Sequence, residues 1–496
     1  MKIGFDNDKY LKLQSENILK RVNKFGDKLY IEFGGKLFDD YHASRVLPGF
    51  LPDSKLRMLL TLKEKVEIVI AINAKDIQKN KMRGDIGINY QSEVLRLIDA
   101  FRESGLFVGS VCITQYQNAP VVDQFREQLK NLGIKSYLHY EIKGYPHDVD
   151  YIISEDGFGK NEYIETTHPI VVVTAPGPGS GKMATCLSQL YHENKRGIKA
   201  GYAKYETFPI WNLALKDPVN VAYEAATADL QDINMIDPYH LDAHGVTTIN
   251  YNRDIEIFPV VKAIFEKIYG SSPYESPTDM GVNMAGYGIS DHTVTDKASC
   301  DEIIRRYYDA KVQFRLGRFS EEAVNKIEIL MKQLNISTND RPCVKAALHK
   351  KEITDGNEAM ALELEDGRII DAKTSDLLTA PAALILNTLK ALAGLDDKAL
   401  LLPRSVIEPV SKMKTKDLGN HNPRLHADEI LIALAISANS KTNEQAKLAI
   451  AQLPNMAHLQ AHSTVILPLQ DADVFKKLKV DVTTEDTSRQ HRLYVK

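Results

Sequence analysis

The feature of this sequence that most constrains its fold is an apolar run followed by a glycine-rich turn and a helix-forming stretch. Ile170–Thr174 has the length and β-branching of a buried strand, and Lys182–Glu193 has the composition of a helix. Between them lies Pro176-Gly-Pro-Gly-Ser-Gly-Lys182. Glycines in such a turn let successive backbone N–H groups converge on an anion at the positive N-terminus of the helix. The pattern predicts a phosphate-binding loop in an α/β protein.

Two positions of this loop depart from the pattern G-x-x-x-x-G-K-[ST] of nucleotide-binding loops. Pro176 stands where the first glycine belongs, and Met183 replaces the hydroxyl residue that binds Mg²⁺. The next hydroxyl, that of Thr185, lies roughly 200° further round the helix. We therefore expect a good anion site and a poor site for a magnesium nucleotide; the alternative is a tight turn that only packs helix on strand. The expected phosphate ligands in the loop are Gly177, Gly179, Ser180, Gly181 and Lys182.

Apolar runs of strand length precede the loop and alternate with helix-like stretches. The expected strands are Leu29–Phe33, Val66–Ile72, Val108–Ile113, Ser136–Tyr140 and Val149–Ile153, and the expected helices are Ser92–Glu103 and Val121–Leu132. Such alternation implies right-handed βαβ units, a mainly parallel sheet, and ligands at the carboxyl ends of its strands. The expected fold class is α/β: an N-terminal, mainly parallel sheet with the phosphate-loop-like strand–loop–helix, a partly helical insert, and a separate C-terminal α/β domain.

The length of 496 residues exceeds what one hydrophobic core usually supports. We place an N-terminal α/β domain at residues 1–217, a partly helical connector at 218–336 and a C-terminal α/β domain at 337–496. A charged helix expected from Cys300 to about Leu334 precedes the boundary loop, Ser337–Pro342. Beyond it, Ala361–Ala372 has the pattern of a hairpin, and Ser463–Leu469 that of a strand.

Charge and cysteine usage exclude several classes of protein. The net charge is −4 and the pI is near 6.4, which argues against a nucleic-acid-binding protein. The N-terminus lacks the apolar stretch of a signal peptide, and the longest apolar run, Leu377–Leu389, is well short of the ~18 residues that a membrane span requires. The four cysteines show no CxxC spacing. We expect a cytoplasmic protein whose partner is neither nucleic acid nor membrane.

The strand expected after the loop helix ends in two charged residues, Lys204 and Glu206. Such a strand often lies beside the phosphate-loop strand, so both charges would face the same crevice. This layout resembles that of dethiobiotin-synthetase-like enzymes, in which a lysine on this strand approaches the substrate. Lys204 would then orient an anionic substrate, and Glu206 would act as base or metal ligand; the alternative is two solvated charges.

Other candidates carry weaker signals. Lys36 follows two glycines in what is either a second anion-binding corner or a plain turn. Arg253 could bind a phosphate with two of its guanidinium nitrogens, or be an ordinary surface arginine. His240 and His244 have the spacing of one helix face with Asp237 a turn earlier, and His458 and His462 repeat the spacing. Neither pair shows the glutamate of H-E-x-x-H, so we expect no metal.

Several strings of the sequence together resemble one bacterial family, catalogued as domain of unknown function 1846. The strings are residues 32–40, 80–85, 174–191, 206–212 and 250–254. The resemblance covers essentially the whole chain and implies a bacterial cytoplasmic protein with an N-terminal α/β part and a separate C-terminal domain. It implies no activity and no catalytic residue.

Our leading hypothesis is an enzyme, a transferase or ligase, that acts on a phosphate-bearing small molecule or a nucleotide. Lys204 and Glu206 would be its catalytic residues, and the cofactor candidate is a nucleotide, with or without Mg²⁺. The alternative is a non-catalytic regulatory protein that senses a metabolite with the same loop. A strand-end carboxylate near Lys182 would favour the enzyme; the candidates are Asp150, Glu206, Asp237 and Asp254. The oligomeric state stays open, with a homo-oligomer as one candidate.

Overall fold

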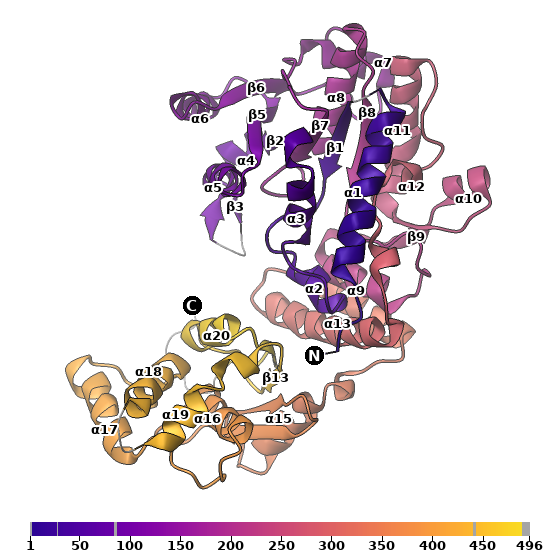
Figure 1. Ribbon diagram of the computed structural model, residues 1–496. Coiled ribbons are helices and arrows are strands. Elements are labelled where there is room, and N and C mark those ends of the chain that lie inside the picture. The colour runs from indigo at the N-terminus through magenta and orange to yellow at the C-terminus, as the bar shows by residue number, and fades with distance from the viewer. Residues whose placement is uncertain (1, 27, 84–86, 440–442, 489–496) are drawn as a thin grey trace. The chain divides into compact units, whose positions relative to one another are not determined.

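The computed structural model describes residues 2–26, 28–83, 87–439 and 443–488, which divide into two compact units (Figure 1). The first unit comprises Lys2–Glu224 and Asp232–Ser299, and the second comprises Ala225–Gln231 and the chain from Cys300 onward. The last two residues of the string at 80–85 lie outside the described residues. In the described part of the chain, no helix combines the length and apolarity needed to cross a membrane.

The first unit is built on a six-stranded sheet in the order β6-β5-β2-β7-β1-β8. Every neighbouring pair in it is parallel, as the alternation of strand and helix patterns predicts. The strands are β1 (Leu29–Phe33), β2 (Val66–Asn73), β5 (Phe107–Tyr116), β6 (Lys135–Tyr140), β7 (Ile170–Thr174) and β8 (Gly201–Tyr205). The expected N-terminal parallel sheet is confirmed.

Helices cover both faces of this sheet because strand side chains alternate between two apolar cores. Leu29 and Ile31 of β1 enter one core, and Tyr30 enters the other. The first core is covered by α1 (Asn7–Lys24), α3 (Ser54–Thr61), α5 (Tyr90–Glu103) and α6 (Pro120–Asn131), and the second by α8 (Lys182–Lys195) and α11 (Asn252–Tyr269). By the same alternation, Glu32 at the carboxyl end of β1 lies on the face of α8 and α11.

Shorter elements complete the first unit. They are α2 (Tyr41–Val46), α4 (Ala74–Gln78), α7 (Val149–Ile152), α10 (Pro238–His244), α12 (Pro277–Met280), and the strand pairs β3 (Met82–Arg83) with β4 (Ile88–Asn89) and β9 (Asn234–Ile236) with β10 (Ile249–Tyr251). Two helices, α9 (Pro218–Ala226) and α13 (His292–Arg315), run across the boundaries between the units. The expected strand at Val149–Ile153 is wrong: Asp148 accepts a hydrogen bond from the Tyr151 N–H (3.1 Å) and starts α7 instead.

The second unit has its own four-stranded mixed sheet, in the order β12-β11-β13-β14, and its own apolar core. The strands are β11 (Ala359–Glu363), β12 (Ile369–Lys373), β13 (Gln460–Ser463) and β14 (Asp481–Thr484), and only β13 and β14 are parallel. The helices are α14 (Glu321–Gln333), α15 (Pro342–Glu352), α16 (Ala380–Leu392), α17 (Arg404–Lys412), α18 (Ala427–Ala438), α19 (Glu444–Ile450) and α20 (Leu469–Lys477). The expected hairpin and the separate C-terminal domain are confirmed.

Three further expectations in this unit are wrong. The single charged helix is two helices, α13 and α14, separated near Gly317, whose φ is +71°. The strand expected from Ser463 ends there, because the Ser463 hydroxyl bonds both the carbonyl (2.7 Å) and the N–H (3.3 Å) of Val465 and turns the chain. His462 therefore lies in β13, so its spacing from His458 does not place the two rings on one helix face.

Candidate functional site

The glycine-rich loop connects the end of β7 to the start of α8, as its sequence predicts. Gly179 and Gly181 adopt left-handed backbone angles, with φ of +76° and +84°. A Cβ atom on Gly181 would lie 2.9 Å from the Thr114 hydroxyl, and one on Gly177 would overlap the Tyr90 hydroxyl. Glycine is therefore required at 181 by both conformation and space, and at 177 by space.

The loop turns its carbonyl groups into the protein. The Gly177 carbonyl accepts from the Ser180 hydroxyl (2.8 Å), that of Gly179 from the Asn73 side-chain amide (3.2 Å), and that of Ser180 from the Thr114 hydroxyl (2.8 Å). Among the described residues, the backbone N–H groups of residues 179–182 have no hydrogen-bond acceptor. The loop thus presents donors at a helix N-terminus, the arrangement that binds anions.

A cavity of about 300 Å³ opens beside these donors. Residues 179–184 of the loop and of α8 form one wall. The opposite walls come from the carboxyl ends of β1, β5 and β6 and the segments that follow them: Glu32, Thr114, Gln115, His139, Tyr140, Glu141, Ile142, Tyr145 and Asn161. Ligand sites of open parallel sheets lie at this edge.

Lys182 supplies a cation to the cavity. Its side chain is half-buried, and within the described ranges it makes no ion pair or hydrogen bond. Met183 also lines the cavity, whereas Thr185 is fully buried and donates its hydroxyl to the Gly181 carbonyl (3.0 Å). The N-terminus of α8 thus offers the cavity positive charge and N–H donors, but neither of these two residues offers a hydroxyl for Mg²⁺.

Glu32 and His139 are two buried ionisable groups of the cavity that the sequence patterns did not single out. The Tyr202 hydroxyl donates to Glu32 (2.7 Å), and the His139 Nε2–H donates to the Glu162 carbonyl (3.2 Å). Burial lowers the pKa of His139 to about 3, so its imidazole is neutral at pH 7. Both lie near the carboxyl ends of parallel strands, and that position is the signal that could have identified them.

The predicted catalytic residues Lys204 and Glu206 lie close together. The Lys204 ammonium contacts both carboxylate oxygens of Asp254 (2.5 and 2.6 Å), the Tyr251 hydroxyl (2.7 Å) and Glu206 Oε1 (3.5 Å). The Tyr251 hydroxyl also donates to Glu206. Glu32 is the neighbour of Lys204 in the register of β1 and β8, so one carboxylate links this cluster to the cavity.

Burial and charge act in opposite directions on the ion pair of this cluster. Burial alone would lower the pKa of Lys204, but the carboxylates of Asp254 and Glu206 outweigh it and raise that pKa above its usual value. Burial raises the pKa of Asp254, against the attraction of Lys204. Lys204 is therefore a fully charged ammonium with its donors occupied, suited to holding neighbours in place rather than to accepting a proton.

Of the predicted site residues, only Gly179, Ser180, Gly181 and Lys182 are among the described residues that line the cavity. Lys204, Glu206 and Gly177 do not line it, and neither do Arg253 and Lys36. The Arg253 guanidinium binds the buried Asp232 carboxylate with two nitrogens (2.7 and 2.8 Å), and Lys36 is exposed in the segment after β1. Asp150 lies at the surface and pairs with Lys267. Phosphate binding by Arg253 and Lys36 stays a prediction.

Two groups of side chains in the described ranges could hold a metal ion. One consists of His240, His244 and Asp279, and the other of Asp217, His292 and Asp296. The first contains the histidine pair that the sequence placed on one helix face, and α10 confirms that placement. Its third member is Asp279 rather than Asp237.

The parallel sheet, its two helical layers and the cavity at the carboxyl ends of the strands define an α/β protein with an open sheet. The chain belongs to the family DUF1846. The model described as "Domain of unknown function DUF1846, N-terminal" matches residues 3–335, and that described as "Domain of unknown function DUF1846, C-terminal" matches residues 339–494. The resemblance noted in the sequence is confirmed.

Relatives in streptococci share the whole length of the chain. The "UPF0371 protein" of Streptococcus sanguinis (strain SK36) is 55% identical over 495 residues, covering 100% of both chains. The "UPF0371 protein SpyM50764" of Streptococcus pyogenes serotype M5 (strain Manfredo) is 54% identical over 494 residues, covering 100% of this chain and 99% of the relative.

Proposed function

We propose that this protein binds a phosphate-bearing small molecule in the cavity at residues 179–184 and acts on it as a transferase or ligase. The main observation behind the proposal is that Lys182 lies beside backbone N–H groups that have no acceptor among the described residues. Both are on one wall of a cavity at the carboxyl edge of the sheet. Backbone donors and a mobile ammonium together are what phosphate groups bind in such loops.

The size and lining of the cavity support a compact ligand. About 300 Å³ is the lower end of the range for small-molecule sites. A small phosphate ester, or the phosphates of a nucleotide, would occupy it. With the phosphate at Lys182, Glu32 and the neutral His139 would face the rest of the ligand, as acceptors for its hydroxyl or amino groups.

Catalysis would involve the carboxylates rather than Lys204. Glu206 is partly buried and contacts both the Lys204 ammonium and the Tyr251 hydroxyl, which would hold its charge in place for a base or metal-ligand role. Lys204 would act through Glu206 and Asp254 by fixing their positions.

Two observations favour a second candidate, a protein that senses the same ligand without turnover. The three donors of the Lys204 ammonium are occupied by Asp254 and Tyr251, and Met183 takes the place of the Mg²⁺-binding hydroxyl. A loop that binds phosphate tightly but assembles no metal would serve recognition.

Thermal unfolding tests the binding proposal. Wild type is heated with inorganic phosphate, ATP, GTP and common sugar phosphates, and linkage predicts roughly 2.7 kcal/mol of stabilisation at a hundredfold excess over Kd. Lys182→Ala should lose the shift, and Lys195→Ala, at the other end of α8, should keep it. If none of these compounds moves the melting temperature of wild type, the proposal is wrong.

A further inference from the structure

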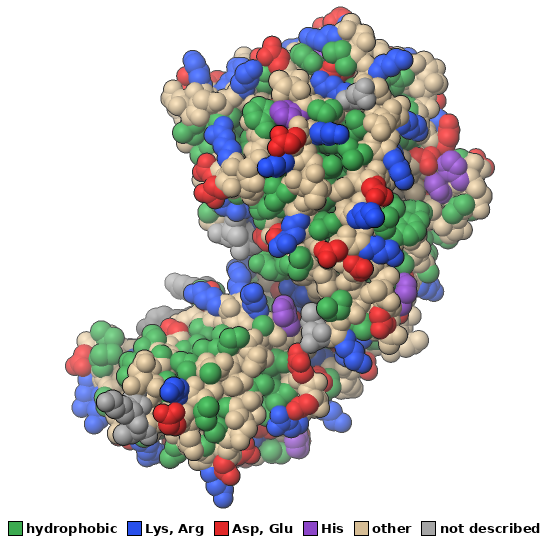
Figure 2. Space-filling model, in the orientation of Figure 1, with side chains coloured by type: hydrophobic (Ala, Val, Ile, Leu, Met, Phe, Trp, Pro, Cys, Tyr) green, Lys and Arg blue, Asp and Glu red, His purple; other side chains and the backbone are tan. Residues whose placement is uncertain are grey.

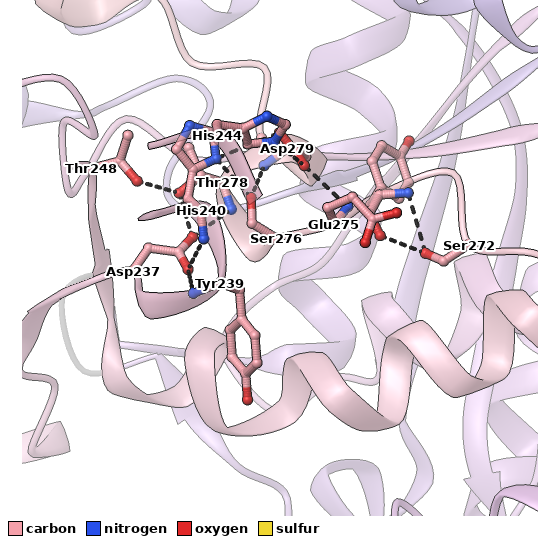
Figure 3. A network of polar contacts seen from close by, with 12 residues as sticks. Asp237, Tyr239, His240, His244, Thr248, Ser272, Glu275, Ser276, Thr278 and Asp279 are labelled. Atoms are coloured by element: carbon pink, nitrogen blue, oxygen red, sulfur yellow. Dashed lines mark hydrogen bonds and ion pairs between the residues drawn. The ribbon is translucent and has the colours of Figure 1, made fainter. Parts of the chain in front are cut away.

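A pair of histidines and an aspartate converge at the surface of the first unit, on elements outside the sheet. His240 and His244 lie one turn apart on α10, with ring centroids 4.5 Å apart. Asp279, on α12, faces both rings (Figure 3). Figure 2 shows histidine and acidic side chains together at the surface where α10 lies in Figure 1.

The distances from the Asp279 carboxylate to the two imidazoles match those between metal ligands, and the ligand atoms of all three side chains lie within 4.8 Å of one another. Asp279 Oδ1 lies 3.1 Å from His244 Nε2 and 3.5 Å from His240 Nδ1. Two ligand atoms that are each 2.0–2.1 Å from the same tetrahedral zinc ion lie about 3.3 Å apart. The carboxylate is therefore placed within a few tenths of an ångström of the separation that a shared ion requires.

Contacts behind the cluster fix the two helices that carry it. The fully buried Asp237 carboxylate accepts from the Tyr239 and His240 N–H groups of α10 (both 3.1 Å) through one oxygen. Its other oxygen accepts from the N–H (3.1 Å) and the hydroxyl (2.6 Å) of Thr278 in α12. Asp237, which the sequence places one turn before His240, thus joins the two ligand-bearing helices, the kind of support that metal ligands need.

The ligands are accessible to an ion from solvent. The exposed fractions of the side chains are 13% for His240, 24% for Asp279 and 40% for His244. The second oxygen of Asp279 is held by the Glu275 N–H (3.1 Å), while the Ser276 hydroxyl hydrogen-bonds His240 Nδ1 (2.8 Å). An ion would replace this last hydrogen bond and leave the Ser276 hydroxyl beside it.

We propose that His240, His244 and Asp279 bind a divalent cation of the zinc type, with the fourth coordination position open to water. Two imidazoles and one carboxylate are a zinc donor set, and three protein ligands with an open position are the pattern of exchangeable rather than closed structural sites. The competing explanation is an ion pair of His244 with Asp279 that binds no metal.

The site would also support the segment beside β8. Asp279 is followed closely by Gly281, which forms a β-bridge with Lys204, and the Val282 N–H donates to the Lys204 carbonyl (3.0 Å). An ion that fixes α12 would therefore stabilise the chain that borders the Lys204 cluster. This inference rests on residues separate from the phosphate loop, so either proposal can fail alone.

Cobalt titration of the full-length, tag-free, chelator-treated protein tests the site. Co²⁺ should give the visible absorption of tetrahedral nitrogen and oxygen ligation, without a thiolate charge-transfer band, and Zn²⁺ should displace it at one equivalent. His244→Gln and Asp279→Asn should each weaken binding by about a hundredfold or more, because even residues behind metal ligands contribute 10–100-fold.

His292→Gln, in the second candidate cluster of the same unit, is the matched control and should bind Co²⁺ as wild type does. Melting curves of the metal-free variants verify that each is folded; His244→Gln changes the most exposed ligand and should leave the curve in place. A wild type without the tetrahedral spectrum overturns the proposal. So does a spectrum that survives both ligand substitutions or disappears in His292→Gln.

Discussion

Two lysines at the carboxyl edge of the same sheet have opposite surroundings. Lys182 begins α8 after the β7 strand and has no ion-pair partner among the described residues. Lys204, in β8, is bound by Asp254, Tyr251 and Glu206. Position at a strand end therefore does not by itself define a ligand-binding charge. Only Lys182 has its charge available to a ligand, and that of Lys204 is used to join β8 to α11.

The two lysines should also differ in what their removal does to folding stability. A buried ion pair contributes little net stability compared with a well-packed apolar pair, but removal of one partner leaves an uncompensated buried charge. Lys204 and Asp254 are both buried, so each depends on the other, whereas Lys182 has no ion-pair partner in the part of the chain that the structure describes. The two lysines should therefore respond to substitution in different ways.

The largest expected effect is on folding stability. Lys204→Met should lower the free energy of unfolding by about 3–5 kcal/mol, because Asp254 is left buried without its cation. Lys182→Met should change it by no more than about 0.5 kcal/mol. Urea denaturation measures both. Equal losses of unfolding free energy in the two variants would contradict the claim that, among the described residues, Lys204 is paired and Lys182 is not.

A smaller effect is expected at the loop glycines. Gly181→Ala should lower stability by about 1–2 kcal/mol from its left-handed backbone alone, with an added loss from the contact with Thr114, and should abolish phosphate binding. Gly197→Ala, past the other end of α8, has a φ of +72° and open space around its Cβ position. This control should lose a similar amount of folding stability from its backbone and should keep phosphate binding. If both variants lose binding, the loss at Gly181 comes from a weakened helix rather than from the loop.

The smallest effect is expected from Mg²⁺. Because Met183 lines the cavity and the Thr185 hydroxyl is directed to the Gly181 carbonyl, Mg²⁺ should change ligand affinity by less than about threefold. Titrations with and without Mg²⁺ measure this. A strong requirement that disappears in Glu206→Gln, with Glu32→Gln as the comparison, would identify Glu206 as the metal carboxylate and support the enzyme over the sensor.

The sequence predicted the part of the fold that depends on local patterns. The apolar run of β1 and the β-branched runs of β2 and β7 identified three inner strands of the sheet. The glycines at 179 and 181 identified a turn, which needs left-handed backbone angles at both positions. At Val149–Ile153 a β-branched composition led to a wrong prediction, because the Asp148 side chain caps a helical turn there by accepting a hydrogen bond from the Tyr151 N–H.

The rest of the site depends on contacts between distant parts of the chain. Glu32 and His139 reach the cavity only because β1 and β6 end at the same edge of the sheet as β7. β1 lies directly beside β7, whereas β5 and β2 separate β6 from β7. Asp279 lies 35 residues after His244, so no local spacing marks it as the third member of the histidine cluster. Burial and pairing also decided the role of Lys204, which a strand-end position alone did not define.

Isothermal titration of inorganic phosphate, and of the most stabilising phosphate ester, tests the central claim most directly. Wild type should bind one equivalent, and Lys182→Ala should bind at least about tenfold more weakly, because a charge-assisted hydrogen bond contributes about 1.5–3 kcal/mol. Lys195→Ala should bind as wild type does. Equal dissociation constants for wild type and Lys182→Ala would contradict the claim that the phosphate lies at the N-terminus of α8.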